Sequence, residues 1–409
     1  MKNMIKGTSI VLLMNLIANG LNYLYQTFAS GVININEYGT LNTIFSFMGI
    51  VAVPGAALTM ISARELALVE ENGDNQEGFV YAIRKKIIIF SFFVIITGLV
   101  CQRIISSLLK IDQKEIIILT VICAGLGYFH PFYSGCLSGK KRFLLLGLYG
   151  LLIPIYKLVG LLFANMMNKE IRLSICLVSI IFGSIITAFI GNYFVVGKHI
   201  HRKNNLAHNY TINYKEWFDP FIVNLCFTIF VNADILIVRR VGLEESSGLY
   251  SSIMLFGRLV YYSSVSIGTV IIPYAATIRD TEDDTFLNRI VLITGAICAI
   301  GLGTFWLVSE KVIGLIYGNE YIAAVGYVPY VCLISFSVAI MTVLINFLIG
   351  RNSIKNTKRI LLGLVFVIIL IALCAKSVHS ALLYLGISGC IADMLIYFSY
   401  ECPYKKARI

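Results

Sequence analysis

The segment 143–166 reads FLLLGLYGLLIPIYKLVGLLFANM and carries one charged side chain, Lys157. A helix needs about twenty apolar residues to cross the hydrocarbon core of a bilayer, so this segment is long enough and apolar enough to span one. A cation in the middle of such a helix costs at least about 2.5–3.5 kcal/mol on insertion scales, and it normally faces a polar interior. Arg258 stands in the same way within another apolar stretch. The sequence therefore predicts a membrane protein with a charged interior.

The composition agrees with this prediction along the whole chain. Of 409 residues, 58% are hydrophobic and 13% are charged, and the mean hydropathy is +0.83. A soluble protein carries about 25% charged residues. The long apolar runs also differ from the alternating pattern of membrane β-strands. About twelve stretches qualify as membrane-spanning helices, roughly 8–33, 38–62, 87–109, 115–137, 143–166, 173–196, 217–238, 249–276, 287–308, 326–349, 360–375 and 378–400.

The net charge of +11 reflects topology and not a nucleic-acid surface. With the N-terminus inside and alternate loops assigned to the cytoplasm, about 22 of the 33 lysines and arginines lie in cytoplasmic segments. The opposite orientation would violate the positive-inside bias. We therefore expect both termini in the cytoplasm and no nucleic-acid partner.

Motifs for enzymatic or metal chemistry are weak. The ten cysteines form no C-x-x-C pair, so we expect neither a disulfide framework nor a zinc site, and no cofactor. The turn 135–141 has the glycines and lysine of a phosphate-binding loop at the wrong spacing. The longest outer loop, about seventeen residues around 309–325, leaves no room for a catalytic domain. We expect a protein that is not an enzyme.

The chain divides near its midpoint at the basic connection 197–216. Each half has a short outer turn with a glycine, Gly39 or Gly248, followed by a span that contains a proline. Transporters are often built from such repeats, with the substrate between them near mid-membrane. We expect an all-α integral membrane protein of about twelve helices in two pseudo-symmetric six-helix bundles around a central cavity. Its parts are an N-terminal lobe at 1–200, a cytoplasmic linker at 201–216 and a C-terminal lobe at 217–409.

Polar side chains form stripes on three predicted spans. At about 100° per residue, each set falls within one arc of its helix. The stripes are Asn15, Asn19, Asn22 and Gln26 on span 1, Asn224, Thr228, Asn232 and Arg239 on span 7, and Ser251, Arg258, Tyr262, Ser266 and Thr269 on span 8. Such residues often only bond neighbouring helices. Arg258 belongs to one of these stripes, and Lys157 is a second cation within a predicted span. The stripes therefore predict the wall of a water-filled, cationic cavity.

The charged residues each have two readings. Lys157 and Arg258 either pair with a carboxylate such as Asp234 or contact an anionic substrate, and guanidinium suits phosphate in particular. Arg239 ends its span, where its side chain could instead reach the membrane interface. Asp234 lies off the stripe and is the candidate for coupling to an ion. Asp393 is a second isolated carboxylate without an assignment.

Several short motifs together resemble a known family. They are Asn232-Ala-Asp234-Ile-Leu-Ile-Val-Arg239, Ser247-Gly248-Leu-Tyr250 and the apolar run to Ile272-Pro273, with Glu37-Tyr38-Gly39-Thr-Leu-Asn42 as an N-terminal counterpart and Tyr317-Gly318-Asn-Glu-Tyr321 before span 10. This pattern resembles the polysaccharide-biosynthesis branch of the MATE-like MOP exporter superfamily, the oligosaccharide (O-antigen, Wzx-type) flippases. The resemblance covers essentially the full chain.

The resemblance implies a substrate and a location. The substrate would be an undecaprenyl-pyrophosphate-linked oligosaccharide, moved from the inner to the outer leaflet of the bacterial cytoplasmic (inner) membrane by alternating access. Partners would be this lipid-linked substrate, membrane lipids and other glycan-assembly proteins. Two alternatives stay open: a multidrug or cation antiporter of the same superfamily, and an integral-membrane glycan polymerase or acyltransferase.

Overall fold

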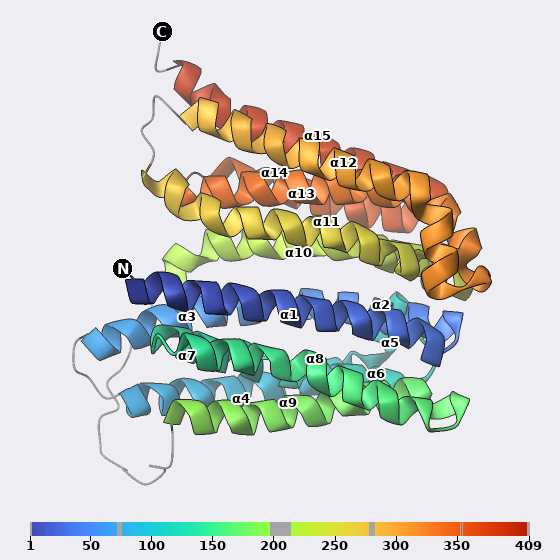
Figure 1. Cartoon of the computed structure of the whole chain (residues 1–409), viewed down its shortest axis with the longest axis horizontal. Coiled ribbons are helices and arrows are strands. Elements are labelled where there is room, and N and C mark those ends of the chain that lie inside the picture. Colours follow the sequence, from blue (N-terminus) through green and yellow to red (C-terminus); the bar gives the residue numbers. More distant parts are fainter. Residues whose placement is uncertain are drawn as a thin grey trace. The chain divides into compact units, whose positions relative to one another are not determined.

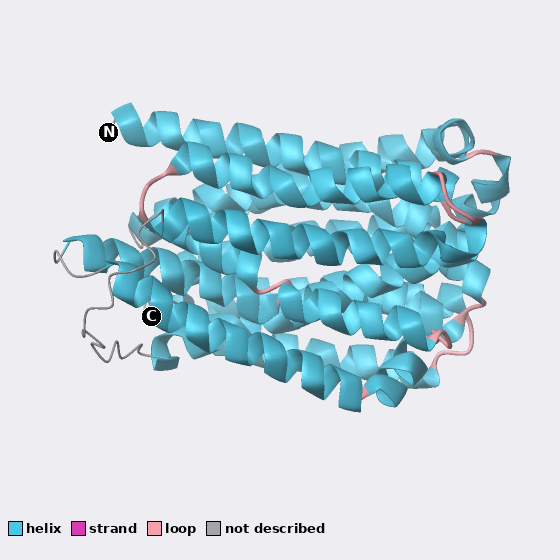
Figure 2. Ribbon diagram, turned by 90° about the horizontal axis from the view of Figure 1, so that it is seen from below, coloured by secondary structure: helices cyan, strands magenta, loops and turns pink. Residues whose placement is uncertain are grey.

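The chain is folded almost entirely into helices. The computed structural model describes residues 2–71, 76–196, 214–277, 283–351, 353 and 355–406. Within those ranges it contains helices and loops and no strand (Figure 2). Every one of the twelve predicted spans is helical, which confirms the expected all-α membrane architecture.

The residue contacts divide the chain into two compact units. Unit 1 comprises 1–34 and 51–213, and unit 2 comprises 35–50 and 214–409. The chain passes from unit 2 back to unit 1 at residue 51, so the helix that follows span 1 belongs to unit 2. The division into lobes at 1–200 and 217–409 stays a prediction.

The described residues of unit 1 form eight α-helices and one 3-10 turn. They are α1 (Lys2–Val32), α3 (Val53–Glu71), α4 (Gln76–Val100), α5 (Gln102–Leu109), α6 (Lys114–Leu126), α7 (Phe129–Gly139), α8 (Phe143–Asn165), η1 (Lys169–Ile171) and α9 (Arg172–Val196). Helix α8 packs between α1 and α9, and α7 packs on α3 and α9 (Figure 1). The core includes Phe132, Tyr133 and Tyr149, which are almost fully buried.

In unit 2 the part of the chain that the structure describes forms seven α-helices and one 3-10 segment. They are α2 (Ile35–Val51), α10 (Tyr214–Val241), α11 (Glu244–Thr277), α12 (Asp283–Tyr317), η2 (Asn319–Tyr327), α13 (Val328–Gly350), α14 (Lys355–Cys374) and α15 (Val378–Lys406). Helix α13 is central, since it packs on α11, α12 and α15, while α10 packs on α14 and α15. As expected, the residues around Lys376 separate the last two spans.

Helices α2 and α11 cross at two glycines, Gly39 and Gly248, which the sequence had singled out. A Cβ on Gly39 would lie 2.5 Å from the backbone nitrogen of Gly248, and one on Gly248 would lie 2.5 Å from Cγ2 of Ile35. Real Cβ contacts are longer, so only glycine permits this approach of the two backbones. The repeated glycines therefore pack against each other within unit 2.

Two predicted spans are broken. Span 2 bends by 45° between α2 and α3, next to Pro54, whose missing N–H removes a helical hydrogen bond. Span 3 bends by 71° between α4 and α5. Residues of α5 alternate between polar and apolar on a short helix, with Arg103 exposed beside Ile104. The predicted span 3 at 87–109 therefore consists of two helices, α4, which ends at Val100, and the shorter α5.

The exposed surface is that of a membrane protein. Large apolar side chains are exposed on several helices, among them Phe92 at 60%, Phe189 at 72% and Leu307 at 89% exposure. A water-soluble monomer rarely exposes so much apolar surface. Eight helices in the described part of the chain are long and apolar enough to span a bilayer, or ten if each bent pair counts as one span. The two remaining predicted spans are α1 and α11, which are two of the three helices with predicted polar stripes.

Candidate functional site

Lys157 lies in the interior of unit 1, between helices α8 and α1. Its Nζ donates to Oδ1 of Asn22 at 3.3 Å and stands 5.7 Å from the ring centre of Tyr25. Tyr25 is 1% exposed. Helix α8 continues through Pro154, so the lysine sits on an unbroken helix. An amide oxygen and an aromatic face are both partners that stabilise a buried ammonium without neutralising it.

The residues of the predicted stripe on α1 differ in their exposure to solvent. Asn15 and Asn19 are exposed, whereas Asn22 and Gln26 are half-buried. Oε1 of Gln26 is buried and has no hydrogen-bond partner among the described residues. Asn22 also donates to the carbonyl of Ala18 at 3.0 Å, which fixes its orientation towards Lys157. The structure thus brings Asn22 and Lys157 together, and the role of the stripe in lining a cavity stays a prediction.

Arg258 lies in unit 2 on α11, facing α2 and α10. Its Nη2 donates to Oγ of Ser46 at 3.2 Å and to Oδ1 of Asn232 at 3.4 Å. Asn232 is oriented by its own bond to the carbonyl of Thr228 at 2.9 Å. Both bonds of the guanidinium are long and both acceptors are neutral. Within the described part of the chain Arg258 makes no ion pair, and its Nη1 and Nε donors are not engaged.

Asp234 is buried next to this cluster, at 5% exposure. Its Oδ2 accepts a hydrogen bond from the hydroxyl of Tyr250 at 2.9 Å, and its Oδ1 accepts one from the backbone N–H of Ile235 at 2.8 Å. Asn232 and Asp234 are two residues apart on α10, and their partners Arg258 and Tyr250 both lie on α11. The carboxylate is thus held by a phenol and a backbone amide, beside the contact between Asn232 and Arg258 and between the same two helices.

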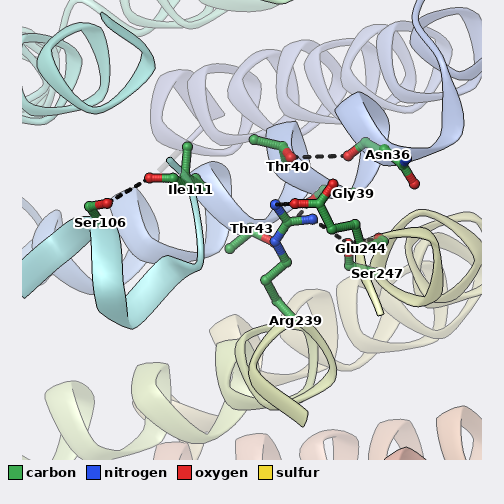
Figure 3. A network of polar contacts seen from close by, with 9 residues as sticks. All are labelled: Asn36, Gly39, Thr40, Thr43, Ser106, Ile111, Arg239, Glu244 and Ser247. Carbon is green, nitrogen blue, oxygen red and sulfur yellow. Dashed lines mark hydrogen bonds and ion pairs between the residues drawn. The ribbon is translucent and has the colours of Figure 1, made fainter. Parts of the chain in front are cut away.

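Arg239 is 3% exposed at the end of α10, and its side chain lies under α2 (Figure 3). It forms an ion pair with Glu244 at 3.3 Å and donates to Oγ of Ser247 at 3.3 Å. Both partners lie in the first two turns of α11. The contacts of Arg239 therefore connect α10 to α11, beside the crossing at Gly39. They do not bring Arg239 to the Arg258 cluster.

The other predicted residues are less informative. Asn224 is exposed on α10. The side chain of Tyr262 lies outside the described residues. Asp393 is 7% exposed in α15, where its Oδ2 accepts a hydrogen bond from Ser337 at 2.7 Å and its Oδ1 has no hydrogen-bond partner among the described residues.

Sequence reasoning missed Ser46, Gly49 and the role of Tyr250. Ser46 and Gly49 lie on α2, and a Cβ added to Gly49 would lie 3.5 Å from the side-chain amide of Asn232. A signal was present, since Asn42, Ser46 and Gly49 follow a helical spacing of small and polar residues. The described residues contain no group of three His, Cys, Asp or Glu side chains that could hold a metal ion.

The same fold occurs in solved transporter structures. An inward-facing multidrug resistance MATE family transporter of the MOP superfamily matches with a TM-score of 0.73 and 13% identity, over 98% of each chain. The lipid II flippase MurJ in an inward closed conformation matches with a TM-score of 0.71 and 14% identity, over 96% of this chain and 87% of that one. The chain has the fold of MOP superfamily transporters.

A third solved structure has the same fold. A MOP superfamily transporter from Pyrococcus furiosus, described as having a binding pocket of reverse polarity that suggests a different function, matches with a TM-score of 0.59 and 14% identity, over 100% of this chain and 95% of that one. No protein-family model and no curated protein sequence matches this chain. At these identities the comparisons show the fold and not the substrate.

Proposed function

We propose that this protein is a flippase that moves an undecaprenyl-pyrophosphate-linked oligosaccharide from the inner to the outer leaflet by alternating access. The observation that carries the proposal is the state of Arg258, a guanidinium in a membrane helix that binds only neutral acceptors, and only through Nη2, among the described residues. Planar guanidinium donors match phosphate oxygens in pairs. Lys157 supplies a second cation, in unit 1, where it contacts the amide oxygen of Asn22 and the ring of Tyr25.

The chemistry of the substrate explains why cations are needed inside the membrane. A sugar–phosphate headgroup cannot cross hydrocarbon, because each unpaired polar or charged group costs several kcal/mol there. Side chains that offer hydrogen bonds and positive charge lower this barrier. An inside-negative membrane potential also favours outward movement of an anion by about 2.3 kcal/mol per charge per 100 mV. The energetics therefore do not require a coupling ion.

The proposal assigns a residue set and a setting. Contacts to the headgroup come from Lys157, Arg258, Asn22, Gln26 and Asn232, and the predicted contacts Asn15, Asn19, Asn224, Arg239 and Tyr262 remain part of the hypothesis. The setting is the bacterial cytoplasmic (inner) membrane with both termini in the cytoplasm, near other glycan-assembly proteins. The lobes at 1–200 and 217–409 would be the two moving parts.

The test uses purified protein in liposomes that contain a fluorescent prenyl-pyrophosphate oligosaccharide. We expect the wild type to expose the label to an external quencher or lectin, and Arg258→Gln and Lys157→Gln each to slow this by about tenfold or more, since a hydrogen bond to a charged group contributes about 1.5–3 kcal/mol. Arg258→Lys should be intermediate because it keeps the charge and loses the planar pair of donors.

The matched control is Arg240→Gln. Arg240 lies in the same unit and donates to the carbonyl of Ala372 at 3.2 Å, so its loss removes one cation without touching the Arg258 cluster. Folded Arg258→Gln and Lys157→Gln proteins that flip the lipid at the wild-type rate would exclude the anion-contact role.

A second candidate is a drug or cation antiporter, which the MATE-like fold and the two buried carboxylates, Asp234 and Asp393, favour. It predicts uptake of a cationic dye such as ethidium into liposomes, driven by a proton or sodium gradient. It also predicts that removing Arg258 leaves dye transport intact. A protein that moves the dye and not the prenyl-pyrophosphate lipid would support this candidate over the flippase.

A further inference from the structure

Asp234 and Arg258 share one cluster, yet they do not bind each other directly. Among the described residues the carboxylate forms two hydrogen bonds, to the Tyr250 hydroxyl at 2.9 Å and to the Ile235 amide at 2.8 Å. The guanidinium binds Ser46 and Asn232. Two opposite charges in one low-dielectric interior would normally close to a direct ion pair.

The arrangement is held by rigid neighbours. Tyr250 is fully buried at 0% exposure, and its ring makes an edge-to-face contact with Tyr327 at 6.1 Å and 78°. Its hydroxyl therefore has one fixed position, and the Asp234 side chain cannot turn away without leaving that hydroxyl buried and unpaired. Asn232 is likewise tied to its own helix.

We propose that Asp234, fixed by Tyr250, is the counter-charge of Arg258 and positions it for anion binding, in place of the ion-coupling role suggested by the sequence. The assignment rests on the proposed function. A carboxylate in direct contact would occupy the donors of Arg258. A carboxylate that is held by Tyr250 stabilises the cation without binding it directly. Among the described residues, the Nη1 and Nε donors of Arg258 then remain available for an anion. The nearby negative charge also lowers the affinity for that anion enough for release.

The proposal makes two neighbouring substitutions act in opposite directions. Asp234→Asn keeps the shape and an acceptor for Tyr250 but removes the negative charge, so an anion at Arg258 should bind more tightly, by about tenfold. Tyr250→Phe keeps the charge but frees the carboxylate to approach Arg258, so the anion should bind more weakly. A substitution that merely damages the fold does not tighten binding.

In the first experiment, the purified, full-length protein is titrated with inorganic pyrophosphate at low ionic strength, and the affinity is measured by calorimetry. Asp393→Asn is the matched control for Asp234→Asn, because Asp393 is similarly buried and bonded to a hydroxyl, with no influence of Arg258. Tyr149→Phe is the control for Tyr250→Phe, since Tyr149 is also fully buried and donates to the carbonyl of Thr187 at 3.2 Å. Both controls should bind as the wild type does.

The second experiment needs no ligand. In thermal unfolding, Arg258→Gln should lower the midpoint because it leaves the buried carboxylate uncompensated, and adding Asp234→Asn should restore a large part of that loss. Such non-additivity measures the interaction of the two charges. The same double substitution with Asp393→Asn in place of Asp234→Asn should be additive.

The outcomes separate this inference from the proposed function. Unchanged or weaker pyrophosphate binding in a folded Asp234→Asn protein, additive unfolding midpoints, or transport that loses its dependence on a sodium or proton gradient in that variant would each overturn the counter-charge role. A folded wild type that binds no pyrophosphate contradicts the flippase proposal, and the ligand-free unfolding cycle then still decides whether Asp234 compensates Arg258.

Discussion

Gly248→Ala tests the closest helix crossing in unit 2. The new methyl group would lie 2.5 Å from Cγ2 of Ile35 and closer still to the carbonyl oxygen of the same residue. Ordinary carbon contacts are about 3.5–4.0 Å, so α2 and α11 would have to separate by about 1 Å. Overpacking of this kind costs about 1–3 kcal/mol, while alanine in a helix gains up to about 1 kcal/mol over glycine. We therefore expect a net loss of about 1–2 kcal/mol.

The measurement is the thermal unfolding midpoint in detergent, read by the loss of the monodisperse peak in size-exclusion chromatography. Gly303→Ala is the control, because a Cβ at Gly303 of α12 meets no atom within 4 Å. It should leave the midpoint unchanged or raise it slightly, by the helix propensity alone. Gly39→Ala should lower the midpoint as Gly248→Ala does, and the double variant should lose less than the sum, since both methyl groups open one crossing.

Equal shifts of the unfolding midpoint in the Gly248→Ala variant and its control would refute this reasoning. If Gly248→Ala and Gly303→Ala shift the midpoint equally and in the same direction, the crossing is not close-packed, and the packing of α2 in unit 2 would need another explanation. A Gly39→Ala loss that adds fully to that of Gly248→Ala would place the two glycines in separate contacts.

Three further predictions concern polar contacts. Lys358→Ala should cost less than about 1 kcal/mol in the unfolding midpoint, and less still in high salt, because its 2.5 Å ion pair with Asp219 is partly exposed on both sides; a large, salt-independent loss would contradict this. Arg239→Gln should lower the unfolding midpoint more than Lys358→Ala does, since the Arg239 side chain is 3% exposed; an equal or smaller loss would contradict this. Asn22→Ala removes the acceptor 3.3 Å from Lys157 and should slow lipid flipping in liposomes, but by less than Lys157→Gln does, because the charge remains; an equal or larger loss would contradict this.

The fold could be anticipated because membrane helices are encoded locally. Each predicted span is an apolar run of bilayer length, and hydrocarbon forces such a run to satisfy its backbone within one helix. What the apolar runs did not predict are the bends within spans 2 and 3. Residues 102–109 form a separate short helix, α5, at 71° to α4. The break before Pro54 had a local signal, and it was not used.

The site was only half anticipated. The periodicity of polar residues identified Asn22, Asn232 and Arg258 as members of interior faces, because one helix face is a property of the sequence. It also grouped Arg239 with Asn232 on the same face of α10, although the contacts of Arg239 are with Glu244 and Ser247. A polar stripe shows that its residues lie on the same face of a helix. It does not show which neighbouring helix that face contacts.

The sequence by itself determined the class of protein, the positions of nearly all helices and the presence of cations within them, because these follow from the free energy of placing each side chain in hydrocarbon. Only the tertiary structure decided that α2 packs with unit 2, that Ser46 and Asn232 are the partners of Arg258, and that the Tyr250 hydroxyl binds Asp234. Those facts depend on contacts between residues as much as 212 positions apart. The physical reason is that burial is an additive property of a segment, whereas the pairing of buried charges is set by the packing of several segments at once.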